Sequence, residues 1–197
     1  EYPYTLRTHI DNLEGLLTAI VPETEQVTLV VHDWGGAIGL GYAVRHPERI
    51  RRLVVLNTAA FLSKRIPLRI DVCRLPILGD IAICGFNAFA RCALSMAVAK
   101  LERMTPEIRA GYLAPYDSWA RRIGILRFVQ DIPMNPRIPS YPVVQEIESL
   151  LPRLAEIPML LQWGARDWCF DLSFLEEWKR RFPQAQVDVY EDAGHYV

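Results

Sequence analysis

Apolar residues recur at helical spacing over the first part of the chain, from about residue 5 to residue 20. The apolar positions are Leu6, Ile10, Leu13, Leu16, Leu17 and Ile20, with polar residues on the other side. This pattern predicts an amphipathic helix that ends at Val21-Pro22. Residues 27–31 follow as a run of apolar or β-branched residues without alternation, which predicts a short strand buried on both faces.

Strand and helix patterns alternate toward both ends of the chain. A helix is expected over about 36–45 and a second buried strand over 53–56. Later in the chain, a helix over 172–182 separates expected strands at 158–164 and 185–190. Strands joined by helical crossovers pair in parallel. The pattern therefore predicts an α/β fold with a parallel sheet in which four strands can be placed.

Between residues 61 and 154 this alternation stops. The segment is helical in pattern, and prolines break it into short pieces. We interpret it as an inserted helical cap (61–154), which divides the α/β core into a first segment (1–60) and a second segment (155–197). The mostly apolar stretch 81–99 could be a membrane span, but Arg91 lies at its middle, so a cap helix that lines a pocket is favoured.

Asp33 stands between the first expected strand and the helix that follows it. Gly35, Gly36 and Gly39 come next, and such small residues allow a sharp turn that raises one side chain above the sheet edge. This strand–turn–helix pattern is typical of a nucleophile elbow. Asp167 and His195 follow the third and fourth expected strands. Because sites in parallel sheets lie at the carboxyl ends of the strands, the three polar residues are expected to meet.

An aspartate at the elbow predicts a particular chemistry. Its carboxylate is ionised near neutral pH, so Asp33 needs no base to attack an sp³ carbon and form an ester with the enzyme. His195 would then activate water against that ester, while Asp167 orients the imidazole. The backbone N–H of Trp34, directly after the nucleophile, is the expected oxyanion donor.

Plainer interpretations of these residues exist. An aspartate at such a turn can be a helix cap, and a Gly-His pair near a chain end can have no role. The order of the three residues and their positions after strands favour the catalytic interpretation. Asn57 follows the second strand, but an amide cannot be the triad acid, and Asp171 is a weaker rival to Asp167. His32 is expected to be structural, packing or bonding beneath the elbow.

Three segments together resemble a known superfamily. Val31-His32-Asp33-Trp34-Gly35-Gly36, Trp163-Gly164-Ala165-Arg166-Asp167 and Ala193-Gly194-His195 are similar to the α/β-hydrolases, in their haloalkane dehalogenase and epoxide hydrolase branch. The resemblance implies that Trp34 holds a halide or other leaving group through its indole N–H. The alternative role for Trp34 is an aromatic wall of the pocket.

The cap resembles a narrower group within this branch. Its segments Arg65–Arg69, Gly111–Trp119 and Arg127–Pro133 are similar to bacterial β-lactone decarboxylases of long-chain olefin biosynthesis, which use the aspartate on a strained ring. Epoxide hydrolases use cap tyrosines to protonate the opening oxygen. For that role the candidates are Tyr112, Tyr116 and Tyr141, although cap tyrosines also serve in packing. Trp119 is either a second halide donor or part of the cap core.

Net charge, the cysteine pattern and apolar content limit the kinds of partner and cellular location that the sequence predicts. The net charge of -1 argues against nucleic acid or an anionic membrane as the main partner. Four cysteines without a CxxC pair favour reduced thiols and a cytoplasmic protein, and neither a signal peptide nor a stable membrane span is expected. The apolar cap suggests a small apolar substrate, and no metal or organic cofactor is expected. The oligomeric state is left open.

The leading hypothesis is a dehalogenase-like hydrolase that forms an ester on Asp33. The alternatives are a β-lactone decarboxylase, an epoxide hydrolase, or a non-catalytic remnant of the fold. In this superfamily, an early strand and loop complete the oxyanion or halide site, and no such segment precedes the first helix pattern. We therefore expect an N- and C-terminally incomplete chain that is poorly active by itself, an expectation that measurable turnover by the 197 residues would contradict.

Overall fold

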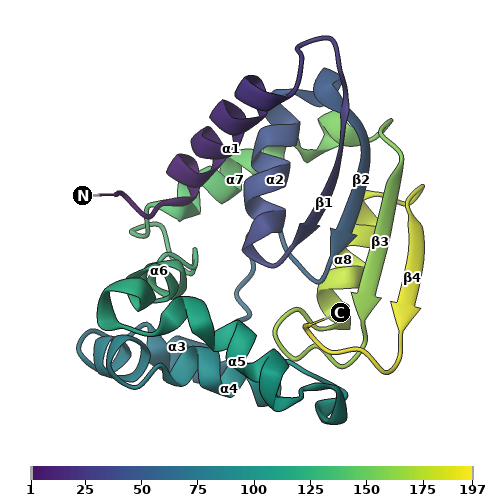
Figure 1. Ribbon diagram of the computed structural model, residues 1–197. Helices are drawn as coiled ribbons and strands as arrows, with labels where there is room; N and C mark the ends of the chain where they lie inside the picture. Colours follow the sequence, from purple (N-terminus) through teal and green to yellow (C-terminus); the bar gives the residue numbers. More distant parts are fainter. Residues whose placement is uncertain (1, 197) are drawn as a thin grey trace.

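Four parallel strands form the centre of the fold in the computed structural model, which describes residues 2–196. The strands β1 (Val27–His32), β2 (Ile50–Leu56), β3 (Met159–Gly164) and β4 (Gln186–Tyr190) lie in that order across the sheet (Figure 1). The parallel sheet with four placed strands is confirmed. β2 begins earlier than expected because Arg51 and Arg52 keep their side chains in solvent while their backbone belongs to the strand.

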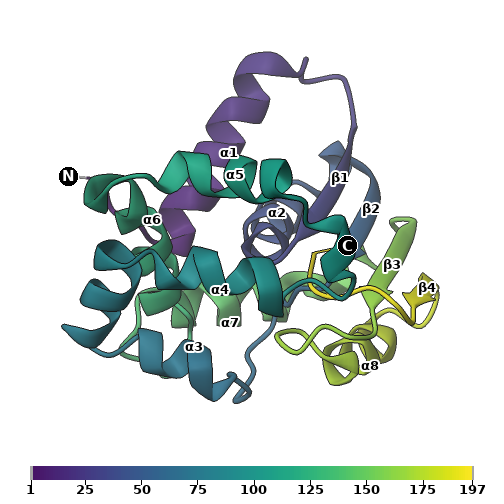
Figure 2. The ribbon, with the colours of Figure 1, turned by 60° about the horizontal axis from the view of Figure 1, so that its bottom comes forward.

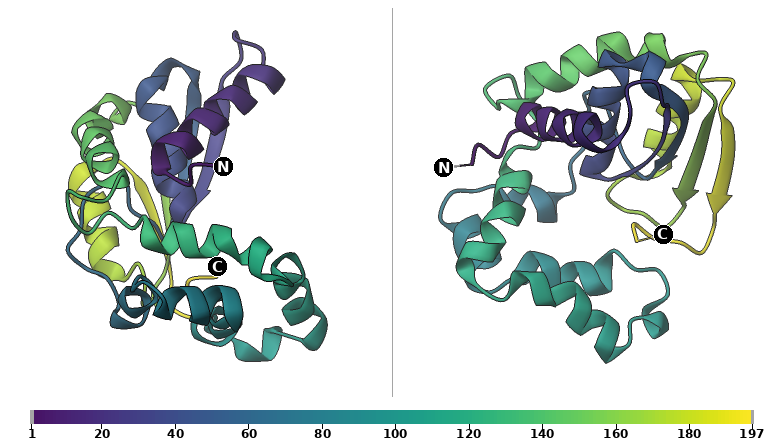
Figure 3. Two further views of the ribbon diagram at one scale, coloured as in Figure 1. Left: turned by 90° about the vertical axis from the view of Figure 1, so that its left-hand side faces the viewer. Right: turned by 45° about the horizontal axis from the view of Figure 1, so that its top comes forward.

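Four helices pack on one face of this sheet and form the main core with it. They are α1 (Leu6–Ile20), α2 (Trp34–Arg45), α7 (Ser140–Leu150) and α8 (Leu172–Arg181) (Figures 1 and 3). Alternate strand residues, among them Leu53, Val55 and Leu161, point into this core and are fully buried. The helices therefore hold the carboxyl ends of the strands in a fixed arrangement.

The expectation that β1 is buried on both faces is wrong. Val31 is buried against the helices, but Thr28 is exposed and Val30 is 68% exposed on the opposite face. Val30 pairs with Val54, which pairs with Leu160, so an apolar row crosses that face. Absence of alternation in a sequence indicates an apolar strand, but whether an element covers each face depends on tertiary packing.

The remaining helices lie beyond the carboxyl ends of the strands (Figure 2). They are α3 (Leu68–Cys73), the π-helical turn η2 (Asp80–Gly85), α4 (Ala88–Met96), α5 (Pro106–Leu113) and α6 (Trp119–Gln130). Short 3₁₀ turns are η1 (Pro47–Arg49), η3 (Leu101–Arg103), η4 (Ala114–Tyr116) and η5 (Leu151–Leu154). Asn87, with a φ of 53°, separates η2 from α4, so the stretch 81–99 is not one helix. Within residues 2–196, every helix is too short or too polar to cross a bilayer.

The packing of α7 bears on the extent of the cap. Val143, Val144 and Ile147 belong to the main core with α1 and α2, whereas α3, η2 and α6 share a separate apolar cluster. The expected cap of residues 61–154 therefore contains one helix that packs as part of the core. We propose a shorter cap, residues 61–139, because a helix is assigned most naturally to the layer in which it is buried.

Candidate active site

The turn between β1 and α2 holds Asp33 in a strained conformation. Its φ of 50° and ψ of -130° fall outside the regions that residues with a side chain normally occupy. The turn is held from both sides: the Asp33 carbonyl accepts hydrogen bonds from the Gly36 N–H at 2.9 Å and from the Thr58 hydroxyl. The surrounding contacts thus fix an aspartate at the apex of the turn, where its side chain is 45% exposed toward the cavity.

The glycine requirement at this turn can be tested at one position. A Cβ on Gly36 would lie 1.9 Å from the Thr58 hydroxyl oxygen, whereas a Cβ on Gly35 meets no atom within 4 Å. We expect Gly36→Ala to lower the free energy of unfolding by about 1–3 kcal/mol through overpacking. The control Gly35→Ala should leave it unchanged or raise it slightly, because alanine favours helix. Urea unfolding measures both, and equal effects would contradict the packing argument.

His195 lies between two carboxylates. Its Nδ1–H donates to Asp167 Oδ2 at 2.8 Å, and its Nε2 lies 3.6 Å from Asp33 Oδ2. The other oxygen of Asp167 accepts backbone N–H bonds from Cys169 at 2.7 Å and Phe170 at 3.2 Å. The buried Asp167 carboxylate is therefore satisfied in place and orients the imidazole toward Asp33.

The charges around His195 control its protonation. Burial by itself lowers the pKa of His195, but the hydrogen bond to Asp167 and the carboxylate of Asp33 outweigh burial and raise the pKa to about 9. His195 is consequently an imidazolium at neutral pH as long as Asp33 is ionised. Burial raises the pKa of the neighbouring Cys169 thiol, and the Asp33 and Asp167 charges add to this effect. Cys169 therefore stays a neutral thiol and does not compete as a nucleophile.

Two residues, His32 and Asn57, hold the backbone around the site through hydrogen bonds. His32, expected to be structural, donates its Nε2–H to the His195 carbonyl at 2.9 Å. Asn57 is fully buried: its amide side chain accepts from the Gly164 N–H at 2.8 Å and donates to the Gly164 carbonyl at 3.2 Å. Its own carbonyl accepts the Asp33 N–H at 3.3 Å. Asn57 thus joins the ends of three strands, a role that its position after β2 did not reveal.

One segment of the cap, residues 96–100, contacts both of the loops that carry Asp167 and His195. The Trp168 indole N–H donates to the Met96 carbonyl at 2.6 Å, and the Tyr196 N–H donates to the Ala97 carbonyl at 3.0 Å. Lys100 forms an ion pair with Asp192. The cap therefore fixes the loops that carry Asp167 and His195. Sequence reasoning missed this segment because backbone carbonyls leave no signal in side-chain patterns.

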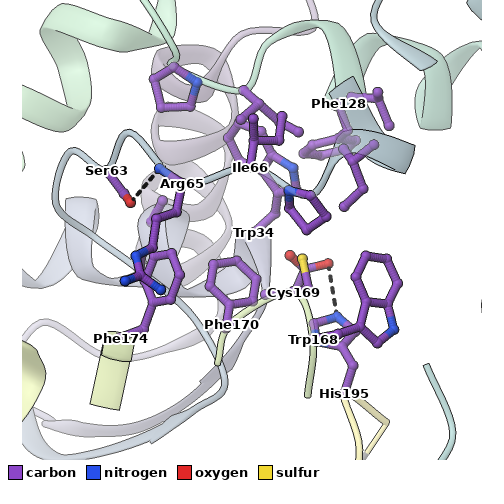
Figure 4. Close-up of a pocket in the computed structure, with 18 of the residues that line it drawn as sticks. Trp34, Ser63, Arg65, Ile66, Phe128, Trp168, Cys169, Phe170, Phe174 and His195 are labelled. Carbon is purple, nitrogen blue, oxygen red and sulfur yellow. Dashed lines mark hydrogen bonds and ion pairs between the residues drawn. The ribbon is translucent and has the colours of Figure 1, made fainter. Parts of the chain in front are cut away.

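A largely apolar cavity of about 420 Å³ opens above the three polar residues. Asp33, Trp34 and His195 line it from the core, and aromatic side chains such as Phe128, Trp168 and Phe170 form much of its wall (Figure 4). Its size is that of a small-ligand site. Among residues 2–196, no cluster of His, Cys, Asp and Glu has the arrangement of a metal site.

Comparison with known proteins identifies the family. The family model described as "Alpha/beta hydrolase family" matches residues 2–197. The chain belongs to the α/β-hydrolase family. A structure of haloalkane dehalogenase DbeA from Bradyrhizobium elkani has the same fold, with a TM-score of 0.85 and 22% identity over 100% of this chain and 69% of that one. The predicted hydrolase fold is thus confirmed.

Two groups among the curated relatives of this α/β-hydrolase bear on its chemistry. Cis-3-alkyl-4-alkyloxetan-2-one decarboxylases from Shewanella oneidensis and Xanthomonas campestris are 49% and 42% identical over 100% of this chain. A haloalkane dehalogenase from Mycolicibacterium paratuberculosis is 31% identical over 83% of the chain. The chain spans 62%, 65% and 52% of the lengths of these three proteins. The resemblance to both groups is therefore confirmed at the level of sequence.

The other candidate residues of this α/β-hydrolase differ in whether they line the cavity. Trp34 lines the cavity, and its indole N–H has no hydrogen-bond partner among residues 2–196. Trp119 does not line the cavity and is 51% exposed. Tyr112, Tyr116 and Tyr141 also lie outside the cavity lining, although Tyr112 stacks on Tyr196, which is part of it.

Proposed function

We propose that this protein is a β-lactone decarboxylase that acts on oxetan-2-ones carrying two alkyl chains. The observation that carries the proposal is the 49% identity, over the whole chain, to a cis-3-alkyl-4-alkyloxetan-2-one decarboxylase. The apolar cavity above Asp33 supports it, because two alkyl chains require an apolar wall and the reacting ring requires a polar group at its base. We thus prefer the β-lactone decarboxylase, which was one of the alternatives from the sequence, to the dehalogenase, which was the leading hypothesis.

The reaction in this proposal needs two steps and no water. The Asp33 carboxylate attacks the ring carbon that bears the 4-alkyl chain, the ring C–O bond breaks, and the opened substrate carries a free carboxylate. The bond between that carboxylate and its neighbouring carbon then breaks, and its electron pair forms the C=C bond. Asp33 leaves with the electron pair of its ester bond, so the products are an alkene and carbon dioxide and the enzyme is regenerated.

The position of His195 suits this sequence. In the resting site its imidazolium lies between Asp33 and Asp167. When the Asp33 charge is consumed in the ester, the released carboxylate supplies a new negative charge beside the ring. His195 then remains protonated and stabilises that carboxylate until carbon dioxide departs. In a dehalogenase the released charge is a halide, which the Trp34 indole N–H would hold, and no carboxylate is released beside the ring. The pKa of His195 then falls when the Asp33 charge is lost in the ester, and the imidazole becomes a base for water.

A haloalkane dehalogenase is the second candidate function. It is favoured by the unpaired indole N–H of Trp34 on the cavity wall beside Asp33 and by the 31% identity to a dehalogenase. Epoxide hydrolysis is less favoured, because none of the proposed tyrosine acids lines the cavity. The four cysteines are free in the structure, which supports the cytoplasmic location that we propose.

Product analysis tests the proposed function. The full native chain that contains these 197 residues is incubated in ¹⁸O-water with a cis-3,4-dialkyl oxetan-2-one and, separately, with a 1-bromoalkane, and the products are identified by mass spectrometry. We expect alkene and carbon dioxide from the lactone and no bromide from the haloalkane. A β-hydroxy acid carrying ¹⁸O would indicate hydrolysis, bromide release would favour the dehalogenase, and no turnover of either substrate would favour the non-catalytic remnant. Each of these results would overturn the proposal.

A further inference from the structure

The charge of this chain is unevenly distributed between its layers. Residues 61–139 contain twelve Lys and Arg against six Asp and Glu, a net charge of +6, whereas the whole chain carries -1. The remaining residues therefore carry -7. The near-neutral total, which argued against an anionic membrane as a partner, conceals a basic cap on an acidic core. An anionic surface would attract the molecule with its cap foremost.

The basic cap also exposes large apolar side chains on one segment. Between residues 68 and 86, which we call the cap tip, the exposed side chains include Leu68, Leu75, Ile77, Leu78, Ile81 and Phe86. Leu68, Ile77 and Phe86 are 77%, 74% and 71% exposed. The cap tip lies at the lower left of Figure 1, away from the sheet. Exposed apolar groups that are clustered in this way mark interaction sites.

The exposed residues face away from the rest of the protein. Ile70 and Ile83, in the same segment, are buried in the cluster that includes Leu126 and Val129 of α6. Leu68 and Val72 lie on the exposed side of α3, one turn apart. The cap tip therefore has an inner face that packs on α6 and an outer apolar face that packs on no described element.

Backbone strain holds one of these side chains in solvent. Ile77 has a φ of 67°, a conformation that a β-branched residue rarely adopts. Its N–H donates to Asp80 Oδ2 at 3.0 Å, which stabilises the turn while the side chain projects outward. Lys64 lies four residues before the cap tip and Arg91 five residues after it, and both are exposed and form no ion pair among residues 2–196. Apolar side chains flanked by unpaired cations suit the interface of an anionic bilayer.

We propose that the cap tip docks on the surface of an anionic lipid bilayer, with its apolar side chains in the interface and the basic cap against the lipid headgroups. A second copy of the chain docked cap to cap is a poorer occupant, because two caps of charge +6 would repel each other. The inner face of α3 contributes Ile70 to the wall of the cavity. Docking would thus bring a cavity for apolar ligands next to the phase in which such ligands dissolve.

Vesicle flotation tests this docking without requiring turnover, so its failure is distinguishable from failure of the proposed reaction. The probes are vesicles of phosphatidylcholine alone or with about a third phosphatidylglycerol. We expect flotation with the anionic vesicles. Partition onto the neutral vesicles should be weaker by about tenfold or more. Raising the salt concentration should weaken the anionic binding.

Paired variants separate the apolar and the charged contributions. Leu68→Ser with Phe86→Ser, and Lys64→Gln with Arg91→Gln, should each reduce partition onto anionic vesicles by about tenfold. The matched controls are Leu16→Ser with Ile20→Ser on exposed positions of α1, and Arg51→Gln with Arg52→Gln on β2. Circular dichroism verifies that all variants fold. We expect the controls to partition as the unmodified protein does.

Three outcomes would overturn the proposal. The first is no flotation of the unmodified protein with anionic vesicles. The second is an equal loss of partition in the control variants, which would mean that binding is not specific to the cap tip. The third is an oligomer, detected by light scattering, that the cap-tip variants convert to a monomer while vesicle partition is absent, which would make the surface a protein contact.

Discussion

Replacement of Asp33 by Asn should abolish the reaction, with turnover reduced by about 10⁴-fold or more. The amide cannot act as an anionic nucleophile, so no ester forms. Asn has nearly the same shape and is among the residues that most readily adopt a positive φ, as Asp33 does at 50°. The variant should therefore fold like the unmodified protein, and single-turnover kinetics with the dialkyl oxetan-2-one measure the loss.

Asp117→Asn is the matched control for this variant. Asp117 lies in the cap, where its carboxylate pairs with Arg121 and both side chains are exposed. We expect its removal to change turnover by less than about twofold, because exposed ion pairs contribute little. Turnover that survives in Asp33→Asn would show that another group attacks the substrate and would contradict the assignment of Asp33.

Replacement of Asp167 by Asn should reduce turnover by about 10³- to 10⁴-fold. The charge that accepts the His195 Nδ1–H at 2.8 Å is lost, so the imidazolium is neither oriented nor stabilised. The pKa of His195, raised to about 9 in the unmodified protein, should fall. In the proposed reaction His195 acts as an acid, so kcat/KM should decline above pH 9 in the unmodified protein and at lower pH in the variant.

The same pKa predicts how stability depends on pH. Because folding raises the pKa of His195 above the usual 6.5, its contribution is fully present below pH 6.5 and is lost as the pH rises through about 9. That contribution is up to about 3 kcal/mol in the unmodified protein and smaller in Asp167→Asn. Denaturant unfolding at a series of pH values measures it.

Asp171→Asn is the control for the acid assignment. Asp171 is the rival acid in the sequence, but the structure places it at the N-cap of α8, where its side chain accepts the Ser173 N–H at 2.9 Å. Asn caps helices as well as Asp, so we expect only a small change in turnover. A loss in Asp171→Asn as large as that in Asp167→Asn would contradict the proposed triad.

The order of the elements and the meeting of Asp33, Asp167 and His195 could be predicted from the sequence. Apolar runs of strand length separated by helix patterns impose a parallel sheet, and the carboxyl ends of parallel strands share one edge. Asp33 follows its strand directly, and Asp167 and His195 follow theirs within three and five residues, so short connections leave little freedom in where they lie. The glycines after Asp33 likewise predicted a tight turn. In the structure, hydrogen bonds from the Gly36 N–H and the Thr58 hydroxyl to the Asp33 carbonyl hold that turn, and Gly36 leaves room for Thr58.

Only the tertiary structure decided which of the candidate aromatic residues reach the cavity. Trp34 does, while Trp119 and the three candidate tyrosines do not, because the direction of a side chain in a short helix depends on how that helix rotates against its neighbours. The covered and open faces of β1 and the assignment of α7 to the core were decided in the same way. The meeting of Asp33, Asp167 and His195 thus follows from the order of strands and helices in the sequence. The side chains that form the cavity wall, and the exposure of the cap tip, depend instead on tertiary packing.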